Sequence, residues 1–273
     1  MTTQLTRISA DGHVHVYPHF RLDQAFDALL ANLDRNARDF WQCDPQDTLR
    51  LAFLTEGSAC RFFEQLQDGT LGPAATNLEI IEQRDEFCLT LMHRGGRRLY
   101  LCAGKQMATR ERLEVIGLAM KEKIPDGLPA RETIDRVVAC GGIPVLPWAP
   151  GKWFFGRGRM VRDLVAASQP GKLALGDSSL RPLGWPEPAI MRTARERGFP
   201  VLPGSDPLPL PGEEQQLGAY GFVYEGPFDT ERPIASVRAL LTGSPAQIIP
   251  AGRRNSLFQM ISRLNRLRKT KNI

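Results

Sequence analysis

The stretch that decides the fold is Ile8-Ser9-Ala10-Asp11-Gly12-His13-Val14-His15, a short apolar segment that runs into two histidines. In a strand, side chains alternate between the two faces, so imidazoles two positions apart point the same way. Two imidazoles on one rigid edge supply half of a divalent metal site. The chain has four histidines in all, and further ligands must therefore come from carboxylates.

Beyond this stretch, apolar runs alternate with helical patterns. Helices are expected over 22–40, 58–67, 129–140, 159–168 and 187–197, and strands over 8–13, 49–54, 143–146, 172–175 and 199–202. Alternating units of this length predict a parallel sheet with helices packed on it.

The middle of the chain breaks the alternation. Apolar runs at 87–92 and 98–102 flank Arg94-Gly95-Gly96-Arg97, which predicts an antiparallel hairpin. The predicted fold class is therefore α/β, an irregular (β/α) barrel with an inserted antiparallel hairpin, forming one domain over residues 1–252. A doubly wound open sheet is the alternative.

The net charge of +5 is concentrated near the C-terminal end. Seven basic and no acidic residues lie between Arg253 and Ile273, and removing these seven charges from +5 leaves −2 on the rest. Apolar residues recur there at Leu257, Phe258, Ile261, Leu264 and Leu267. This spacing predicts a basic amphipathic helix over 253–273, docked on the body with its basic face in water. Contact with nucleic acid or an anionic membrane surface is the less favoured alternative.

Composition limits the class of protein. Hydrophobic residues make up 42% of the chain and charged residues 24%, which is ordinary for a soluble globular protein. No apolar run is long enough to span a membrane. The five cysteines have no paired spacing, and the first residues lack the apolar region of a secretory signal, so a cytoplasmic location is expected.

Candidate catalytic residues follow the strands, because chemistry in such barrels collects at the C-terminal ends of the strands. We expect His13 and His15, with Glu56 and Asp206, to hold one divalent ion. Mixed imidazole and carboxylate sites hold zinc, manganese or iron. Either Asp206 or Asp177 would act as general base for attack on an ester.

Basic and polar residues follow the same strand ends and suit a small anionic substrate. The expected substrate-binding residues are Lys105, Gln106, Trp148, Lys152 and Arg181. The alternative is that the basic residues among them are solvated loop positions.

These motifs resemble the polymerase and histidinol phosphatase (PHP) family over residues 7–222. His13 and His15 match the opening His-x-His of that family. Asp206, in Gly204-Ser205-Asp206-Pro207-Leu208, matches its closing Ser-Asp-x-His, and Leu54-Thr55-Glu56-Gly57 lies where the family has Thr-Asp-His. The resemblance implies an irregular barrel that hydrolyses phosphate esters with bound divalent ions.

Four ligand positions of the family carry other residues here, namely Gly57, Gln106, Trp148 and Leu208. The resemblance therefore implies at most one ion in this chain. Two hypotheses stay open: a hydrolase of a small phosphate ester, and a non-catalytic barrel, with or without metal, that binds a small anionic ligand or a protein partner. The wider amidohydrolase group, which also opens with His-x-His, would require further histidines on later strands.

Overall fold

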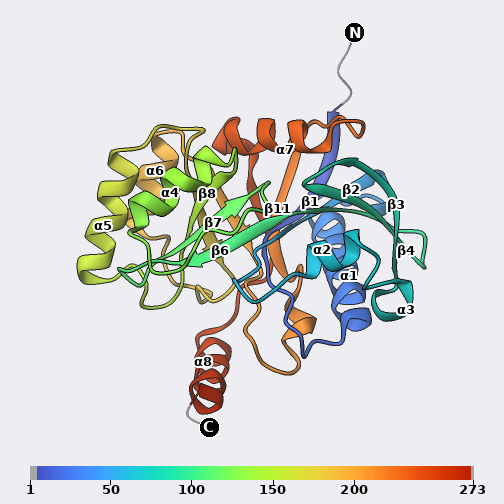
Figure 1. The fold of residues 1–273 in the computed structure, drawn as a ribbon, viewed down its shortest axis with the longest axis horizontal. Coiled ribbons are helices and arrows are strands. Elements are labelled where there is room, and N and C mark those ends of the chain that lie inside the picture. Colours follow the sequence, from blue (N-terminus) through green and yellow to red (C-terminus); the bar gives the residue numbers. More distant parts are fainter. Residues whose placement is uncertain (1–4, 272–273) are drawn as a thin grey trace.

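The structure is a computed structural model that describes residues 5–271. Its strands form two sheets (Figure 1). The first sheet pairs, in spatial order, β12 (Ile249–Gly252), β11 (Tyr220–Pro227), β1 (Leu5–Val14), β2 (Thr48–Leu54), β5 (Arg98–Cys102), β4 (Cys88–His93) and β3 (Leu78–Asp85). The second pairs β10 (Val201–Gly204), β9 (Ala174–Ser178), β8 (Ile143–Pro147), β7 (Glu114–Leu118) and β6 (Gly104–Ala108).

Both sheets are mixed, so the prediction of a parallel sheet is right for part of each. β1, β2 and β5 run parallel, as do β8, β9 and β10. β11 is antiparallel to β1, and β7 is antiparallel to both β6 and β8. The predicted hairpin is confirmed, because β4 and β5 pair antiparallel around the turn at 94–97.

The sheets do not close into the predicted (β/α) barrel. Within residues 5–271 no ladder joins them, and they remain two open sheets that meet at strand ends. On one side Glu56 N–H donates to the Gly104 carbonyl oxygen at 3.0 Å, and on the other Asp206 N–H donates to the His13 carbonyl oxygen at 3.0 Å. A Cβ on Gly204 would lie 2.4 Å from the His13 Cβ, so glycine permits this close approach.

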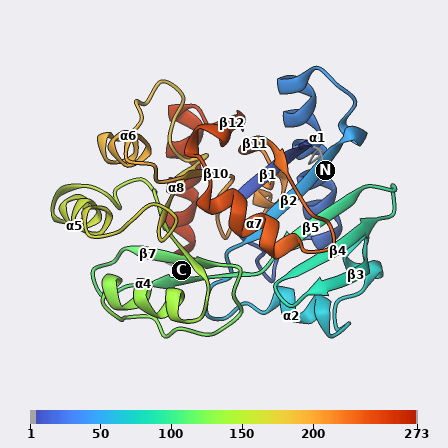
Figure 2. The same cartoon turned by 90° about the horizontal axis from the view of Figure 1, so that it is seen from above.

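Helices cover the sheets on both sides. They are α1 (Leu22–Trp41), α2 (Phe62–Gln67), α3 (Pro73–Thr76), α4 (Ala130–Ala139), α5 (Phe155–Ala166), α6 (Ala189–Glu196), α7 (Pro233–Thr242) and α8 (Leu257–Lys271), with short 3-10 turns at Pro45–Asp47, Glu213–Gln216 and Pro245–Gln247. Figure 2 shows α4, α5 and α6 around the second sheet, α1 and α2 beside the first, and α7 across the space between them. α7 lies at the end where β1 begins, whereas α8 lies at the opposite end (Figure 1).

Apolar side chains fill the space between the sheets and on their outer faces. Phe53 and Phe222 stack 6.5 Å apart in the central cluster. Phe26 on α1 and Leu164 on α5 belong to the clusters that bury the outer faces of the first and second sheets. Among the helices of the described part, none is long and apolar enough to cross a membrane.

The predicted C-terminal helix is present as α8, but its docked face differs from the prediction. Leu257, Phe258 and Ile261 are exposed, Phe258 to 80%. Met260 and the partly buried Leu264 pack against the segment that follows β10. The predicted stripe is therefore wrong over the first turn of the helix.

A buried ion pair explains how α8 is turned. Arg263 is 7% exposed and donates to both oxygens of the buried Glu213 carboxylate. Glu213 lies in the 3-10 turn after β10, so the Arg263 guanidinium faces inward. This contact sets which face of α8 is docked on the body.

We predict that Arg263→Ala lowers the free energy of unfolding by about 3 kcal/mol, because it leaves the Glu213 carboxylate buried without its partner. Urea denaturation measures the change. Lys269→Ala, at an exposed position of the same helix, should leave the unfolding midpoint unchanged. Replacing Arg263 and Glu213 together with methionine should recover most of the loss, and equal losses for the single and double variants would contradict this account.

Candidate metal centre

Three side chains that could bind a metal ion meet at the end of β1. They are His13, His15 and Asp206, whose ligand atoms all lie within 4.8 Å of one another. The two Nε2 atoms are 3.0 Å apart, and Asp206 Oδ1 lies 3.6 Å from that of His13 and 3.9 Å from that of His15. The predicted meeting of the paired imidazoles with the late aspartate is therefore present in the structure.

The spacing of these atoms fits a metal ion. Ligand atoms bound tetrahedrally at about 2 Å from zinc lie about 3.3 Å from one another, close to the three distances found here. Burial, and then the neighbouring His13, lower the pKa of His15 to about 3. His15 is therefore neutral near pH 7, and its nitrogen lone pair is available to a cation.

Neighbouring side chains fix the orientation of these ligands. The Thr55 hydroxyl lies 3.3 Å from Nδ1 of His15 and donates to the Val14 carbonyl oxygen. Ser178 Oγ donates to Oδ2 of Asp206 at 2.9 Å, which leaves Oδ1 facing the imidazoles. Burial would raise the pKa of Asp206, but its interactions with the two histidines, the hydrogen bond from Ser178 and the charge of Arg263 together lower it. Hydrogen bonds of this kind orient metal ligands in proteins.

Asp11, in the same motif, holds the ligand-bearing segments together. Its Oδ1 accepts the backbone N–H groups of His13 and Ser205 at 3.0 and 2.9 Å, and its Oδ2 accepts that of Gly218 at 2.8 Å. The side chain is fully buried, and burial raises its pKa to about 6 although these hydrogen bonds oppose the shift. Asp11 thus positions both histidines and Asp206 without lying in their cluster.

Glu56, expected as a ligand, lies elsewhere. Its carboxylate pairs with the Lys105 ammonium and accepts the N–H of Phe63. Lys105 also donates to Glu64 at 2.9 Å. Burial would lower the pKa of Lys105, but the hydrogen bonds to Glu56 and Glu64 raise it, so the ammonium stays charged. The predicted ligand and the predicted anion-binding lysine therefore neutralise each other.

Asp177 is also occupied. Its Oδ1 accepts from Arg181 Nε at 2.8 Å, and its Oδ2 accepts from Arg181 Nη2 at 2.6 Å and from the Tyr220 hydroxyl at 2.7 Å. This bidentate pair joins a predicted base to a predicted substrate-binding residue, and it lies outside the cluster of three ligands.

The other predicted substrate-binding residues are spread around the same end of the fold. Lys152 donates to Glu114 at 2.8 Å, with about a third of its side chain exposed. Gln106 has a buried Oε1 with no hydrogen-bond partner among the described residues. Trp148 is buried and lines a cavity beside α8.

The sequence reasoning missed Tyr17 as a neighbour of the site. Its ring centroid lies 5.4 Å from that of His15. Burial, and then the charge of Asp206, raise the pKa of its hydroxyl, which stays protonated. Tyr17 continues the alternation of His13 and His15 by two positions, and that spacing could have identified it.

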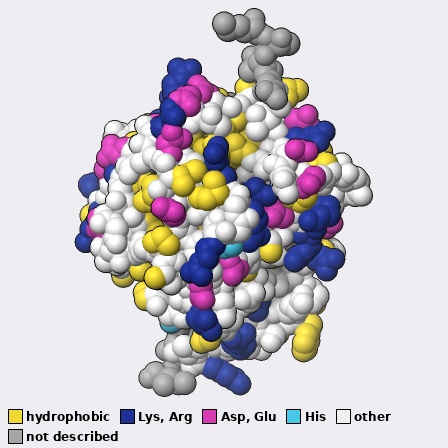
Figure 3. Space-filling model, turned by 90° about the vertical axis from the view of Figure 1, so that its right-hand side faces the viewer, with side chains coloured by type: hydrophobic (Ala, Val, Ile, Leu, Met, Phe, Trp, Pro, Cys, Tyr) yellow, Lys and Arg dark blue, Asp and Glu magenta, His cyan; other side chains and the backbone are white. Residues whose placement is uncertain are grey.

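Charged side chains are mixed over the face seen in Figure 3, where Lys and Arg alternate with Asp and Glu. The face has no broad field of one sign. The net charge of +5 therefore does not by itself indicate a surface for a polyanion there.

No protein-family model and no curated protein matches the chain. Among solved structures, its fold is similar to that of PsfC from Pseudomonas syringae, with a TM-score of 0.56 and 13% identity over 98% of this chain and 99% of that one. It is also similar to PfuEndoQ, a lesion-specific endonuclease from Pyrococcus furiosus, with a TM-score of 0.50 and 12% identity over 88% of this chain and 56% of that one.

A two-domain protein from Bacteroides vulgatus that contains a predicted PHP-like metal-dependent phosphoesterase overlaps more loosely, with a TM-score of 0.44 and 12% identity. The overlap covers 91% of this chain and 66% of that one. At these identities, the likeness to PsfC and PfuEndoQ shows a common fold alone.

We predict that Asp11→Asn lowers the free energy of unfolding by about 2 kcal/mol, because the amide NH₂ would face a backbone donor in place of an acceptor oxygen. The same variant should bind metal more weakly than the parent protein. Urea denaturation and a metal titration measure the two effects. Asp39→Asn, at an exposed position of α1, is the matched control, and equal behaviour of the two variants would refute the role given to Asp11.

Proposed function

We propose that this chain is a metal-dependent hydrolase of small phosphate esters, with one divalent ion bound by His13, His15 and Asp206. The observation that carries the proposal is the cluster of their three ligand atoms, all within 4.8 Å of one another. The resemblance of the flanking motifs to the PHP family supports it, and so does a fold similar to that of the lesion-specific endonuclease PfuEndoQ.

The donor set suits a catalytic ion. Two imidazoles and one carboxylate leave coordination positions open in zinc, manganese or iron sites. When bound, such an ion supplies the Lewis acidity that stabilises charge on a phosphoryl group. His15 would bind through Nε2, while its Nδ1 faces the Thr55 hydroxyl.

Of the two aspartates expected as base, the proposal favours Asp206. One of its oxygens takes the hydrogen bond from Ser178 and the other faces the imidazoles. Both oxygens of Asp177 are already engaged by Arg181, and one of them also by Tyr220. We assign Asp177 to holding Arg181 in place, and Asp206 to the ion and to proton transfer.

Among the basic residues, we assign contact with the anionic substrate to Lys152. Its pair with Glu114 is the most exposed of the three pairs, whereas Lys105 and Arg181 are buried with their carboxylates. A partly exposed pair is exchanged at less cost than a buried one. Lys152 can therefore turn toward a phosphate without leaving a buried charge unpaired.

The second candidate function is a non-catalytic fold that binds an anionic ligand or a protein partner. The burial of the cluster favours it, because the ligand side chains are only 5–14% exposed. Metal binding without ester hydrolysis would support this second function.

Metal analysis tests the site. We expect about one equivalent of zinc, manganese or iron in the purified protein, and its loss in the His13→Ala/His15→Ala double variant. His19→Ala is the matched control, because His19 is exposed and lies outside the cluster. A protein that neither contains nor takes up a divalent ion, or a double variant that binds it as the parent does, would exclude the proposed site.

Release of phosphate from a generic aryl phosphate tests the activity. We expect a chelator to abolish release, and added divalent ion to restore it. Asp206→Asn should lower kcat by at least 100-fold, because it removes the charge of a ligand and base. Turnover that survives both the chelator and Asp206→Asn would contradict the assignment of this centre.

A further inference from the structure

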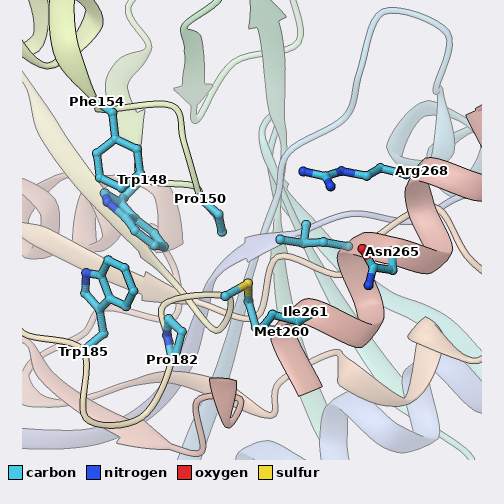
Figure 4. Close-up of a pocket in the computed structure, with 10 residues that line it drawn as sticks. Trp148, Pro150, Phe154, Pro182, Trp185, Met260, Ile261, Asn265 and Arg268 are labelled. Carbon is cyan, nitrogen blue, oxygen red and sulfur yellow. The ribbon is translucent and has the colours of Figure 1, made fainter. Parts of the chain in front are cut away.

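A cavity of about 260 Å³ lies between α8 and the loops that follow β8 and β9 (Figure 4). One wall carries aromatic residues, among them Trp148, Phe154 and Trp185, and the opposite wall is α8. A short stretch of chain links the cavity to the metal centre. Leu208 follows Asp206 by two residues and belongs to the same apolar cluster as Met260, which lines the cavity.

The aromatic wall is unusually exposed. Trp185 is 43% and Phe154 is 45% exposed, although both belong to residue types that normally bury most of their surface. Ile261 of α8, on the facing wall, is 46% exposed. Clustered apolar surface left in water is typical of a ligand site rather than of a surface selected for stability alone.

The polar side chains at the cavity have no hydrogen-bond partners in the part of the chain that the structure describes. Arg268 and Asn265 line it from α8, and within residues 5–271 neither has a side-chain hydrogen bond or an ion pair. Figure 4 shows Arg268 extending from the helix toward the aromatic wall. Trp148 also lines the cavity, and its indole N–H has no hydrogen-bond acceptor among residues 5–271.

The charge at the cavity is positive. Within residues 5–271 its lining includes a guanidinium and no carboxylate, and the sequence of α8 has no acidic residue. A cavity with flat aromatic walls, few polar groups and a guanidinium that has no carboxylate partner among the described residues is complementary to a flat ring that carries a negative charge.

We propose that this cavity binds the aromatic ring of a small phosphorylated molecule, such as a nucleoside monophosphate, with the ring against Trp185 and Trp148 and the phosphate on Arg268. The volume fits one ring system, since it falls just below the range of about 300–1,000 Å³ for drug-sized ligands. The inference goes beyond the hydrolase proposal, because it concerns binding and holds whether or not the metal centre cleaves an ester.

Titration of the full chain with adenosine 5′-monophosphate, followed by tryptophan fluorescence and calorimetry, tests the inference. A chelator is present, so that binding is measured apart from turnover and apart from the metal centre. We expect adenosine and ribose 5-phosphate each to bind at least tenfold more weakly than the monophosphate, because each lacks one half of the recognised chemistry.

Two variants separate the two contacts. Trp185→Ala should weaken the binding of the monophosphate and of adenosine alike, by about tenfold. Arg268→Gln should weaken the binding of the monophosphate and leave the affinity for adenosine unchanged. Lys269→Gln is the matched control, because it removes the same charge from the next residue, which does not line the cavity. Trp185, Arg268 and Lys269 are all at the surface. A thermal melt confirms that each variant is folded.

The inference is overturned if Trp185→Ala binds the monophosphate as the parent does, or if Arg268→Gln and Lys269→Gln weaken it equally. A single-stranded oligoadenylate of six residues distinguishes a small ligand from a nucleic-acid strand. Binding of this strand more than tenfold tighter than the monophosphate would replace the proposal with a strand-docking surface, whereas comparable or weaker binding supports it.

Discussion

The buried carboxylate of Asp11 is the interaction on which the site depends. It accepts backbone N–H groups from the end of β1, from the segment after β10 and from the loop before β11. Each of these N–H groups would otherwise be a buried donor without a partner, at a cost of about 1–3 kcal/mol. The two open sheets share no ladder at this point. Hydrogen bonds to the Asp11 side chain therefore hold together segments that strand pairing does not join. The positions of His13 and Asp206 follow from a carboxylate that is not in their cluster.

The metal cluster differs from the other acidic residues nearby in how the negative charge is balanced. A buried ion is stable only when paired, because desolvation costs several kcal/mol. Glu56 has Lys105 and Asp177 has Arg181, both at close range. Asp206 faces imidazoles, and that of His15 is neutral near pH 7. Among the described residues, the Asp206 carboxylate is paired with no lysine or arginine, which is the electrostatic condition that a bound cation satisfies.

Periodicity predicted the parts of the fold that follow regular patterns, including α1, α4 and the hairpin of β4 and β5. It did not predict the hairpin of β6 and β7, because a single residue separates Gly104–Ala108 from β5 and the segment shows no apolar alternation. In the site, strand ends located the candidate side chains, and His13, His15 and Asp206 do meet. Which carboxylates were neutralised could not be predicted, since Lys105 and Arg181 reach their partners through contacts that no motif encodes.

The tail helix belongs to the same end of the molecule as the metal cluster, and this changes how its basic charge is understood. Arg263 reaches the turn after β10, and its charge is among those that lower the pKa of Asp206. Leu208 and Leu210, in the segment that follows Asp206, pack beneath Met260. A shift of α8 would therefore move the chain that carries a ligand. Among the basic residues of α8, Arg263 anchors the helix to Glu213 and Arg266 donates to the Pro211 carbonyl oxygen at 2.7 Å, whereas Arg268 lines the cavity.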